Sequence, residues 1–210
     1  MKQEFWQEKW QANEIGFHQD VVHPLLVKYL ATFSLEKDSR VFVPLCGKSR
    51  DIICVREQGY EVIGLELSEL AVESFFSEND ILANSSESPD FNHFKARNIE
   101  ILCGDFFSLT QKLLGNISAV FDRAALIALP EEMRIAYVKK MQTLLMPGTQ
   151  ILLISLEYEK GLVNSPPHTV LETEVTELYS DWCDVYLLER AVAEVKGKPC
   201  HELVYRLTVR

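Results

Sequence analysis

Charged side chains stand directly after short apolar runs, at the positions where strands of an open sheet present groups to a ligand. Glu66 closes the run 62–66, and a carboxylate placed there accepts hydrogen bonds from ribose hydroxyls. Asp105 and Phe106 follow the run 99–103, where the carboxylate can receive an adenine amino group and the ring can pack on the base. Two plainer interpretations stay open: Glu66 as a surface carboxylate, and Asp105 as the N-cap of a following helix.

Asp122 and Arg123 follow a further apolar run, 117–121. The planar fork of a guanidinium suits carboxylates, so an arginine that faces a pocket at a strand end indicates an anion-binding site. Arginine stays protonated at neutral pH and cannot act as a base, so its contribution is to donate hydrogen bonds and stabilise negative charge. An ordinary ion pair between Asp122 and Arg123 is the alternative.

The turn 44–49, Pro-Leu-Cys-Gly-Lys-Ser, follows the first apolar run and enters a helix. Its single glycine fits neither the dinucleotide fingerprint nor a P-loop, which disfavours NAD. The five cysteines include no CxxC pair, which argues against a zinc site and a disulfide scaffold, and we expect no metal. No His/Asp or Cys/His pair stands out at catalytic spacing.

Near-continuous apolar runs of this length are typical of strands buried on both faces, as in a parallel sheet. Helical stretches alternate with them: Ser68 can cap one helix, and Pro130 begins another that Pro147 and Gly148 end. This alternation predicts right-handed βαβ units in an α/β, doubly wound, mostly parallel sheet. The expected strands occupy residues 40–45, 62–66, 99–103, 117–121 and 150–156.

The C-terminal part differs, because residues 182–190 and 202–209 are strand-like and are joined by a turn that contains glycine and proline. This pattern predicts an antiparallel hairpin at one edge of the sheet. The segment 84–98 is polar, with Phe91 and Phe94 set in it. For this segment we expect a mobile edge loop, with a lid over the site as the alternative.

The composition, 47% hydrophobic and 25% charged, is that of a soluble globular protein, and no linker or repeat divides the single domain expected over 1–210. A net charge of −10 provides no excess of positive charge for binding nucleic acid or an anionic membrane, so a small molecule is the expected partner. No apolar run could span a membrane, and the polar N-terminus lacks the features of a signal peptide. We therefore expect a cytoplasmic protein, and a monomer.

Five motifs, taken together, resemble one enzyme family. They include Trp-x3-Trp, Gly-Phe-His-Gln and Val-Pro-Leu-Cys-Gly-Lys, in the order of the N-terminal signature of thiopurine S-methyltransferases, and the compact loops look like the bacterial branch. The resemblance implies a Rossmann-like methyltransferase fold and transfer of a methyl group from S-adenosyl-L-methionine to a thiopurine-like or other aromatic or heterocyclic thiol. The motifs lie at 5–10, 16–19, 43–48, 64–68 and 121–126.

The resemblance also implies which residues bind the cofactor. Trp10 would lie over it, Leu45 would line its methionine end, and Glu66 would hold its ribose. Asp105 and Phe106 would border its adenine. These roles agree with the positions of Glu66 and Asp105 after their strands.

On the acceptor side, the resemblance implies that Phe17 walls the pocket. Arg123, the expected catalytic residue, would either contact the cofactor or steady the negative charge of the acceptor. Trp6 and Trp10 are four residues apart and share one face of a helix. We interpret Trp6 as pinning an N-terminal helix to the core.

Two departures from the family pattern concern the acceptor. His23 precedes Pro24 where bacterial members often have Asn-Pro, so we assign His23 no ligand role. The family has a second basic residue near the acceptor, and here it falls among Arg190, Lys196 and Lys198. The acceptor itself is encoded in no motif.

The sulfonium of the cofactor already activates its methyl group, and an acidic thiol needs no strong general base. The enzyme would desolvate the thiolate in an aromatic pocket and hold it in line. One alternative is a methyltransferase for halide, thiocyanate, or oxidised selenium or tellurium species. Another is a non-catalytic module that binds the cofactor, and a dehydrogenase ranks third because the glycine fingerprint is absent.

Overall fold

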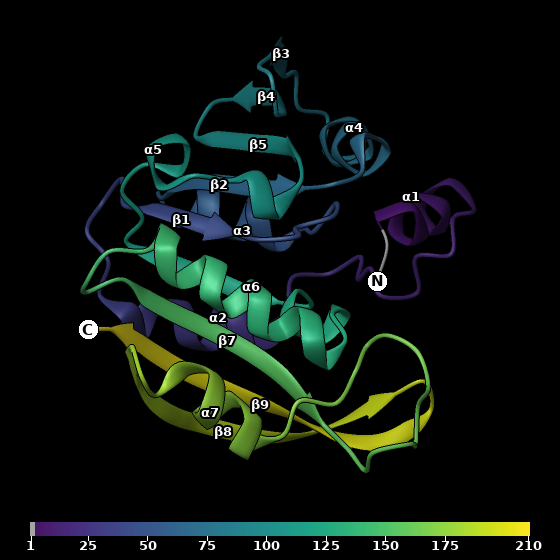
Figure 1. Ribbon diagram of the computed structural model, residues 1–210. Coiled ribbons are helices and arrows are strands. Elements are labelled where there is room, and N and C mark those ends of the chain that lie inside the picture. Colours follow the sequence, from purple (N-terminus) through teal and green to yellow (C-terminus); the bar gives the residue numbers. More distant parts are fainter. Residues whose placement is uncertain (1–2) are drawn as a thin grey trace.

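Nine strands form one mixed sheet in the computed structural model, which describes residues 3–210 (Figure 1). The order across the sheet is β3-β4-β5-β2-β1-β6-β7-β9-β8. The middle strands, from β5 to β7, run parallel, and antiparallel pairs extend the sheet at both edges. The strands are β1 (Arg40–Val43), β2 (Glu61–Glu66), β3 (Asn84–Glu87), β4 (Phe91–Ala96), β5 (Ile99–Gly104), β6 (Ala119–Arg123), β7 (Gln150–Glu157), β8 (Cys183–Val195) and β9 (Lys198–Val209).

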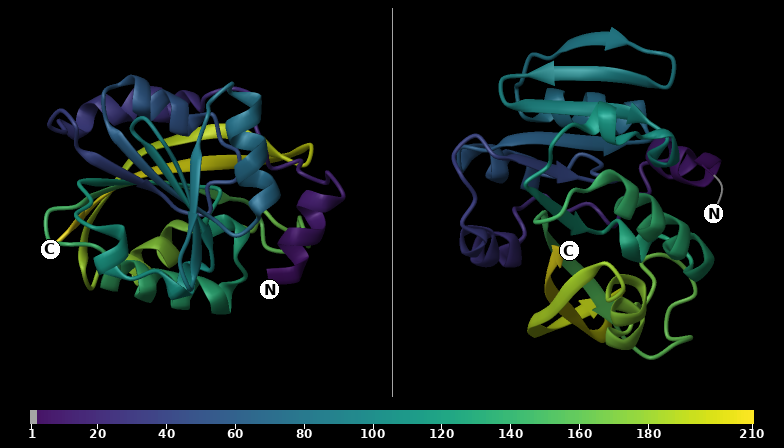
Figure 2. Two further views of the ribbon diagram at one scale, coloured as in Figure 1. Left: turned by 90° about the horizontal axis from the view of Figure 1, so that it is seen from above. Right: turned by 60° about the vertical axis from the view of Figure 1, so that its left-hand side comes forward.

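Helices cover both faces of the sheet, as the left view of Figure 2 shows. One face packs against α2, α3 and α4 through residues such as Leu26 and Phe75, and the other against α5, α6 and α7 through Tyr137 and Val175. The doubly wound α/β fold predicted from the sequence is thus confirmed. The helices are α1 (Gln3–Gln11), α2 (Pro24–Leu30), α3 (Asp51–Glu57), α4 (Glu69–Glu78), α5 (Gln111–Leu114), α6 (Glu131–Leu144) and α7 (Glu172–Tyr179), with short 3-10 helices at Ala31–Phe33, Phe106–Ser108 and Leu126–Ala128.

Local signals read from the sequence set several element boundaries. The hydroxyl of Ser68 accepts a hydrogen bond from the amide of Ala71 at 3.4 Å, which caps α4, and Pro130 stands at the N-cap of α6. The C-terminal hairpin is confirmed as β8 and β9. Its turn places both Lys196 and Gly197 in the left-handed region, as a two-residue hairpin turn of the right twist requires.

The segment 84–98, expected to be a mobile edge loop, is instead the hairpin of β3 and β4, which pairs antiparallel with β5. Phe91 is buried in the core, and the ring of Phe94 stacks on Phe76 of α4, with 6.3 Å between the centroids. The polar residues of β3 are exposed, whereas Ser88, His93 and Lys95 are held by the contacts described next. None of residues 84–98 lines the large cavity described below, so the alternative of a lid is also wrong.

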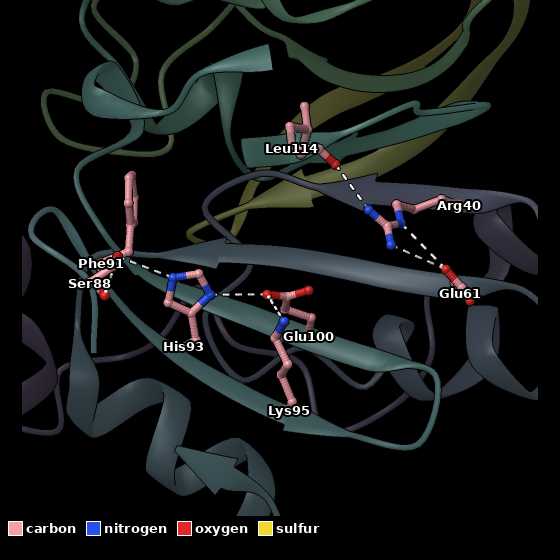
Figure 3. Close-up of polar contacts among 8 residues, drawn as sticks. All are labelled: Arg40, Glu61, Ser88, Phe91, His93, Lys95, Glu100 and Leu114. Atoms are coloured by element: carbon pink, nitrogen blue, oxygen red, sulfur yellow. Dashed lines mark hydrogen bonds and ion pairs between the residues drawn. The ribbon is translucent and has the colours of Figure 1, made fainter. Parts of the chain in front are cut away.

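An ion cluster fixes the edge hairpin to the parallel sheet (Figure 3). The carboxylate of Glu100 on β5 lies 3.1 Å from Nδ1 of His93 and 3.0 Å from Nζ of Lys95, both on β4. The other ring nitrogen of His93 lies 3.1 Å from the hydroxyl of Ser88. Polar sequence and regular strand structure are compatible here because the charges are paired across neighbouring strands.

Adjacent residues of β6 point to opposite faces of the sheet, and this separates Asp122 from Arg123. Asp122 is 1% exposed and accepts hydrogen bonds from the Tyr137 hydroxyl at 2.7 Å and the Leu126 amide at 3.3 Å. Arg123 faces the other side of the sheet, towards Asp51. The ion pair between Asp122 and Arg123, considered above, is therefore absent. Burial raises the pKa of Asp122 to about 6, against the opposing effect of its hydrogen bonds.

This buried carboxyl predicts a pH dependence of stability. Native Asp122 keeps its proton up to about pH 6, whereas in the unfolded chain it loses the proton near 3.8. Between these values the native state binds more protons, so the free energy of unfolding should fall as pH rises, by about 2–4 kcal/mol in total. Asp122→Asn should remove this fall. Urea denaturation at pH 4 and pH 7 measures it, and identical pH profiles for the two proteins would contradict the assignment.

Candidate functional site

A cavity of about 1050 Å³ opens at the carboxyl ends of β1, β2, β6 and β7. In a parallel sheet these ends meet at one edge, which is where open α/β folds bind ligands. Helix α1 borders one side of the cavity, and residues 165–167 together with the β8–β9 turn border the other. The volume is at the upper end of the range for small-molecule sites and leaves room for two ligands side by side.

Glu66, the last residue of β2, provides a buried carboxylate at the wall of the cavity, with 6% of its surface exposed. One oxygen accepts a hydrogen bond from the Gly47 amide at 2.7 Å, and the other accepts one from the Ser68 amide at 2.9 Å. Burial raises the pKa of this carboxyl, and the backbone hydrogen bonds oppose the rise. Each carboxylate oxygen can accept a second hydrogen bond, so Glu66 can still bind hydroxyl groups of a ligand.

The turn after β1 has an unusual backbone. Leu45 has φ of +46° and Gly47 has φ of +52°, and the Cys46 amide donates to the Leu65 carbonyl at 2.9 Å. A Cβ on Gly47 would come within 3.1 Å of the Trp10 ring, so the close packing of Trp10 on this turn requires glycine. A left-handed leucine is uncommon and is found where surrounding structure holds the backbone in place, often at functional sites.

Three aromatic rings form the wall between α1 and the cavity. Phe17 packs edge-to-face on Trp6 and on Trp10, with centroid distances of 5.6 and 5.5 Å. Trp10 is only 6% exposed, whereas Trp6 is half-buried and lines the cavity. The expectation that Trp6 pins α1 to the core is therefore wrong, and Trp10 is the anchoring residue. Trp10 can hold the helix and still present its ring to a ligand.

Asp105 and Phe106 lie beyond β5, at the end of the cavity near β2. One oxygen of Asp105 accepts a hydrogen bond from the Phe107 amide at 3.0 Å, so the N-cap interpretation is confirmed, for a 3-10 helix. The second oxygen is left for a ligand. Phe106 is 3% exposed, with its centroid 4.7 Å from that of Tyr137, and it forms part of the cavity floor.

Arg123 ends β6 and faces the cavity with 14% of its side chain exposed. Its Nη1 lies 4.0 Å from a carboxylate oxygen of Asp51, which is itself held by the Ser49 hydroxyl at 3.0 Å and the His23 amide at 2.8 Å. Burial lowers the pKa of the Arg123 guanidinium, and the charges of Asp51 and Glu202 oppose this. The contact with Asp51 is long, so the guanidinium fork remains available to an anion.

Of the C-terminal basic residues, the structure brings only Lys196 to the cavity wall, where its ammonium lies 2.6 Å from the Ser165 hydroxyl. Arg190 pairs instead with Glu157 and Glu172 on the outside of β8. Lys198 does not line the cavity. Lys196 is therefore the candidate for the second basic residue near an acceptor.

The family model described as thiopurine S-methyltransferase matches residues 1–204. Proteins named thiopurine S-methyltransferase are 48% identical in Nitrosomonas eutropha (90% of this chain, 86% of the relative) and 41% identical in Pseudomonas fluorescens, where both chains are covered completely. The chain belongs to the thiopurine S-methyltransferase family. It is an S-adenosylmethionine-dependent methyltransferase.

Solved structures at lower identity agree with the fold. A 1,6-didemethyltoxoflavin-N1-methyltransferase from Burkholderia thailandensis superposes with a TM-score of 0.71 at 13% identity, covering 99% of this chain and 86% of that one. A methyltransferase from Anabaena variabilis gives a TM-score of 0.69 at 14% identity, covering 99% and 95%. The Rossmann-like methyltransferase fold predicted from the sequence is confirmed.

All the residues assigned a role from the sequence line the same cavity, and their individual roles stay predictions: Trp10, Phe17, Leu45, Glu66, Asp105, Phe106 and Arg123. Sequence reasoning missed Asp51 and Glu202, two further carboxylates of the cavity wall. Asp51 could have been noticed as the acid in the first turn of the helix after the Pro-Leu-Cys-Gly turn. Glu202 lies within β9 and has no local signal of its own.

Glu66→Gln should weaken the binding of S-adenosylhomocysteine about 10- to 150-fold, which corresponds to a loss of roughly 1.5–3 kcal/mol for hydrogen bonds to a charged acceptor. An amide must also turn its NH2 group towards the Gly47 or the Ser68 amide. Calorimetric titration measures the affinity, and Glu69→Gln, three residues on and outside the cavity, is the control. Unchanged affinity in a folded Glu66→Gln protein would remove Glu66 from the cofactor site.

Proposed function

We propose that this enzyme transfers the methyl group of S-adenosylmethionine to the sulfur of an aromatic or heterocyclic thiol, such as a thiopurine. The observation that carries the proposal is the position of Arg123, a mostly buried guanidinium in the same cavity as the aromatic rings of Trp6 and Phe17. A flat, anionic acceptor needs both a charge partner and an apolar wall. The net charge of −10 supports a small acceptor over a nucleic acid.

The cavity residues fit S-adenosylmethionine at the end nearest β2. The Glu66 carboxylate has acceptor capacity left for the ribose hydroxyls, and the spare oxygen of Asp105 suits the adenine amino group. Leu45 and Trp10 enclose the space over the turn after β1, where the methionine end would lie. When bound, the cofactor supplies a methyl group that its sulfonium has already activated.

The acceptor end lies beyond Arg123, between the aromatic wall and the β8–β9 turn. Arg123 donates to the thiolate and holds it in line, while Phe17 and Trp6 exclude water from the sulfur. In a site with little water, a fixed positive charge interacts more strongly with an anion than it does in solvent. Lys196 adds a second positive charge at the far wall.

An acceptor panel tests the proposal. The purified protein is incubated with methyl-labelled cofactor and thiopurines or other heterocyclic thiols, and in parallel with iodide, thiocyanate, selenite and tellurite. Label on the sulfur of the heterocyclic thiols supports the proposal. Label only on the inorganic acceptors would identify a methyltransferase for halide, thiocyanate, selenium or tellurium species. Cofactor binding without any transfer would identify a non-catalytic binding module.

Phe17→Ala should raise the Michaelis constant for the thiol acceptor and leave the affinity for S-adenosylhomocysteine within a few-fold. The reason is that Phe17 lines the cavity on the α1 side, where its ring packs on Trp6 and on Trp10. Steady-state kinetics and calorimetry measure the two quantities. The reverse pattern would mean that Phe17 belongs to the cofactor wall.

Arg123→Ala should lower turnover of thiolate acceptors by about 10²-fold or more, whereas Arg123→Lys should keep partial activity because it keeps the charge and loses the planar fork. If Arg123 serves the acceptor, S-adenosylhomocysteine binds the alanine variant normally. If it serves the cofactor carboxylate, that binding weakens. Normal turnover in a folded Arg123→Ala protein would contradict both roles.

A further inference from the structure

A second carboxylate, that of Glu202, shares the acceptor end of the cavity with Arg123. Arg123 is in register with Ile154 of β7, and Glu202 of β9 is in register with Leu156 on the other side of the same strand. Residues paired in register point to the same face of a sheet, and so do residues two apart on one strand. The side chains of Arg123 and Glu202 therefore project from one face into one cavity, where the charge of Glu202 acts on the guanidinium.

One carboxylate oxygen of Glu202 is held in position by the imidazole of His23. Nε2 of His23 lies 3.1 Å from Oε1, and His23 is only 2% exposed, so the imidazole cannot reorient into solvent. A carboxylate only accepts hydrogen bonds, so the proton lies on Nε2. The second oxygen, Oε2, has no partner within residues 3–210. Glu202 thus presents one oxygen to the cavity from a fixed position.

An acceptor that is only a thiolate makes no use of this oxygen, because it carries no hydrogen-bond donor. Asp51 lies 4.0 Å from Arg123 and the charge of Glu202 also acts on it, so two carboxylates already offset part of the guanidinium charge. An acceptor that brings a hydrogen-bond donor beside its sulfur meets complementary groups instead. A heterocyclic thioamide has such a pair, because its ring N–H stands next to the C=S group.

We propose that Glu202 accepts the ring N–H proton of a heterocyclic thioamide while Arg123 holds the sulfur, an inference that rests on the proposed function. In this step the acceptor sulfur forms its bond to the methyl carbon as the carbon–sulfonium bond breaks, and that electron pair stays on the departing sulfur. The N–H electron pair moves into the ring, the C=S bond becomes a single bond, and the proton passes to Oε2 of Glu202. Glu202 returns the proton to solvent through the 22% of its side chain that is exposed.

Two acceptors that differ in the N–H group test the proposal. Pyridine-2-thione carries the ring N–H beside its sulfur at neutral pH, whereas 4-nitrothiophenol has no such group and is already ionised. Glu202→Gln keeps a carbonyl oxygen for the His23 hydrogen bond but cannot take up a proton. It should lower kcat/KM for pyridine-2-thione about 10²-fold and change that for 4-nitrothiophenol less than about 3-fold. The ratio is measured within one protein sample, so partial loss of folded enzyme cancels.

Glu189→Gln is the matched control, because Glu189 pairs with Lys28 and Tyr29 on the neighbouring strand β8 and does not line the cavity. It should leave the ratio at the wild-type value. Equal losses for both acceptors in Glu202→Gln, or no loss for either, would overturn the role of Glu202 and leave the proposed function standing. If the wild-type enzyme methylates neither thiol, the proposed function fails, and this inference fails with it.

Discussion

The site depends on the hydrogen bonds that the Glu66 carboxylate accepts from the Gly47 and Ser68 amides. They tie the turn after β1 to the end of β2, nineteen residues further along the chain, and to the N-terminus of α4, which directly follows β2. The turn held in this way carries Leu45 in a left-handed conformation and brings Gly47 against the ring of Trp10. One buried carboxylate therefore shapes the cofactor end of the cavity. The cost of its burial is offset because its own oxygens are satisfied by the backbone.

The opposite end of the cavity is organised by charge, and strand alternation decides which charges take part. Asp122 and Arg123 are neighbours in β6, yet they point to opposite faces of the sheet. Asp122 accepts a hydrogen bond from the hydroxyl of Tyr137 in α6, whereas the side chain of Arg123 lines the cavity. The guanidinium is thus free of the carboxylate next to it in the sequence. It meets Asp51 and Glu202, which reach the same place from α3 and β9.

The five parallel strands could be predicted because strands that are buried on both faces produce near-continuous apolar runs. The charged residues at the ends of these strands could be located for the same reason. The edge hairpin β3–β4 could not be predicted, since only a few of its residues, chiefly Phe91 and Phe94, contact the core and most of the others are polar. The short helices α2 and α7 were not predicted either. The separation of Asp122 from Arg123 follows from strand period once β6 is extended to residue 123. Glu202 gave no signal, because its role arises from strand pairing over long range.

The most direct test is a crystal structure with S-adenosylhomocysteine and a heterocyclic thiol bound together. The account predicts the ribose hydroxyls on Glu66 and the acceptor sulfur facing the guanidinium of Arg123, in line with the position of the missing methyl group. Binding of the thiol at the Glu66 end, or with its sulfur turned away from Arg123 towards Trp6 and Phe17, would contradict it.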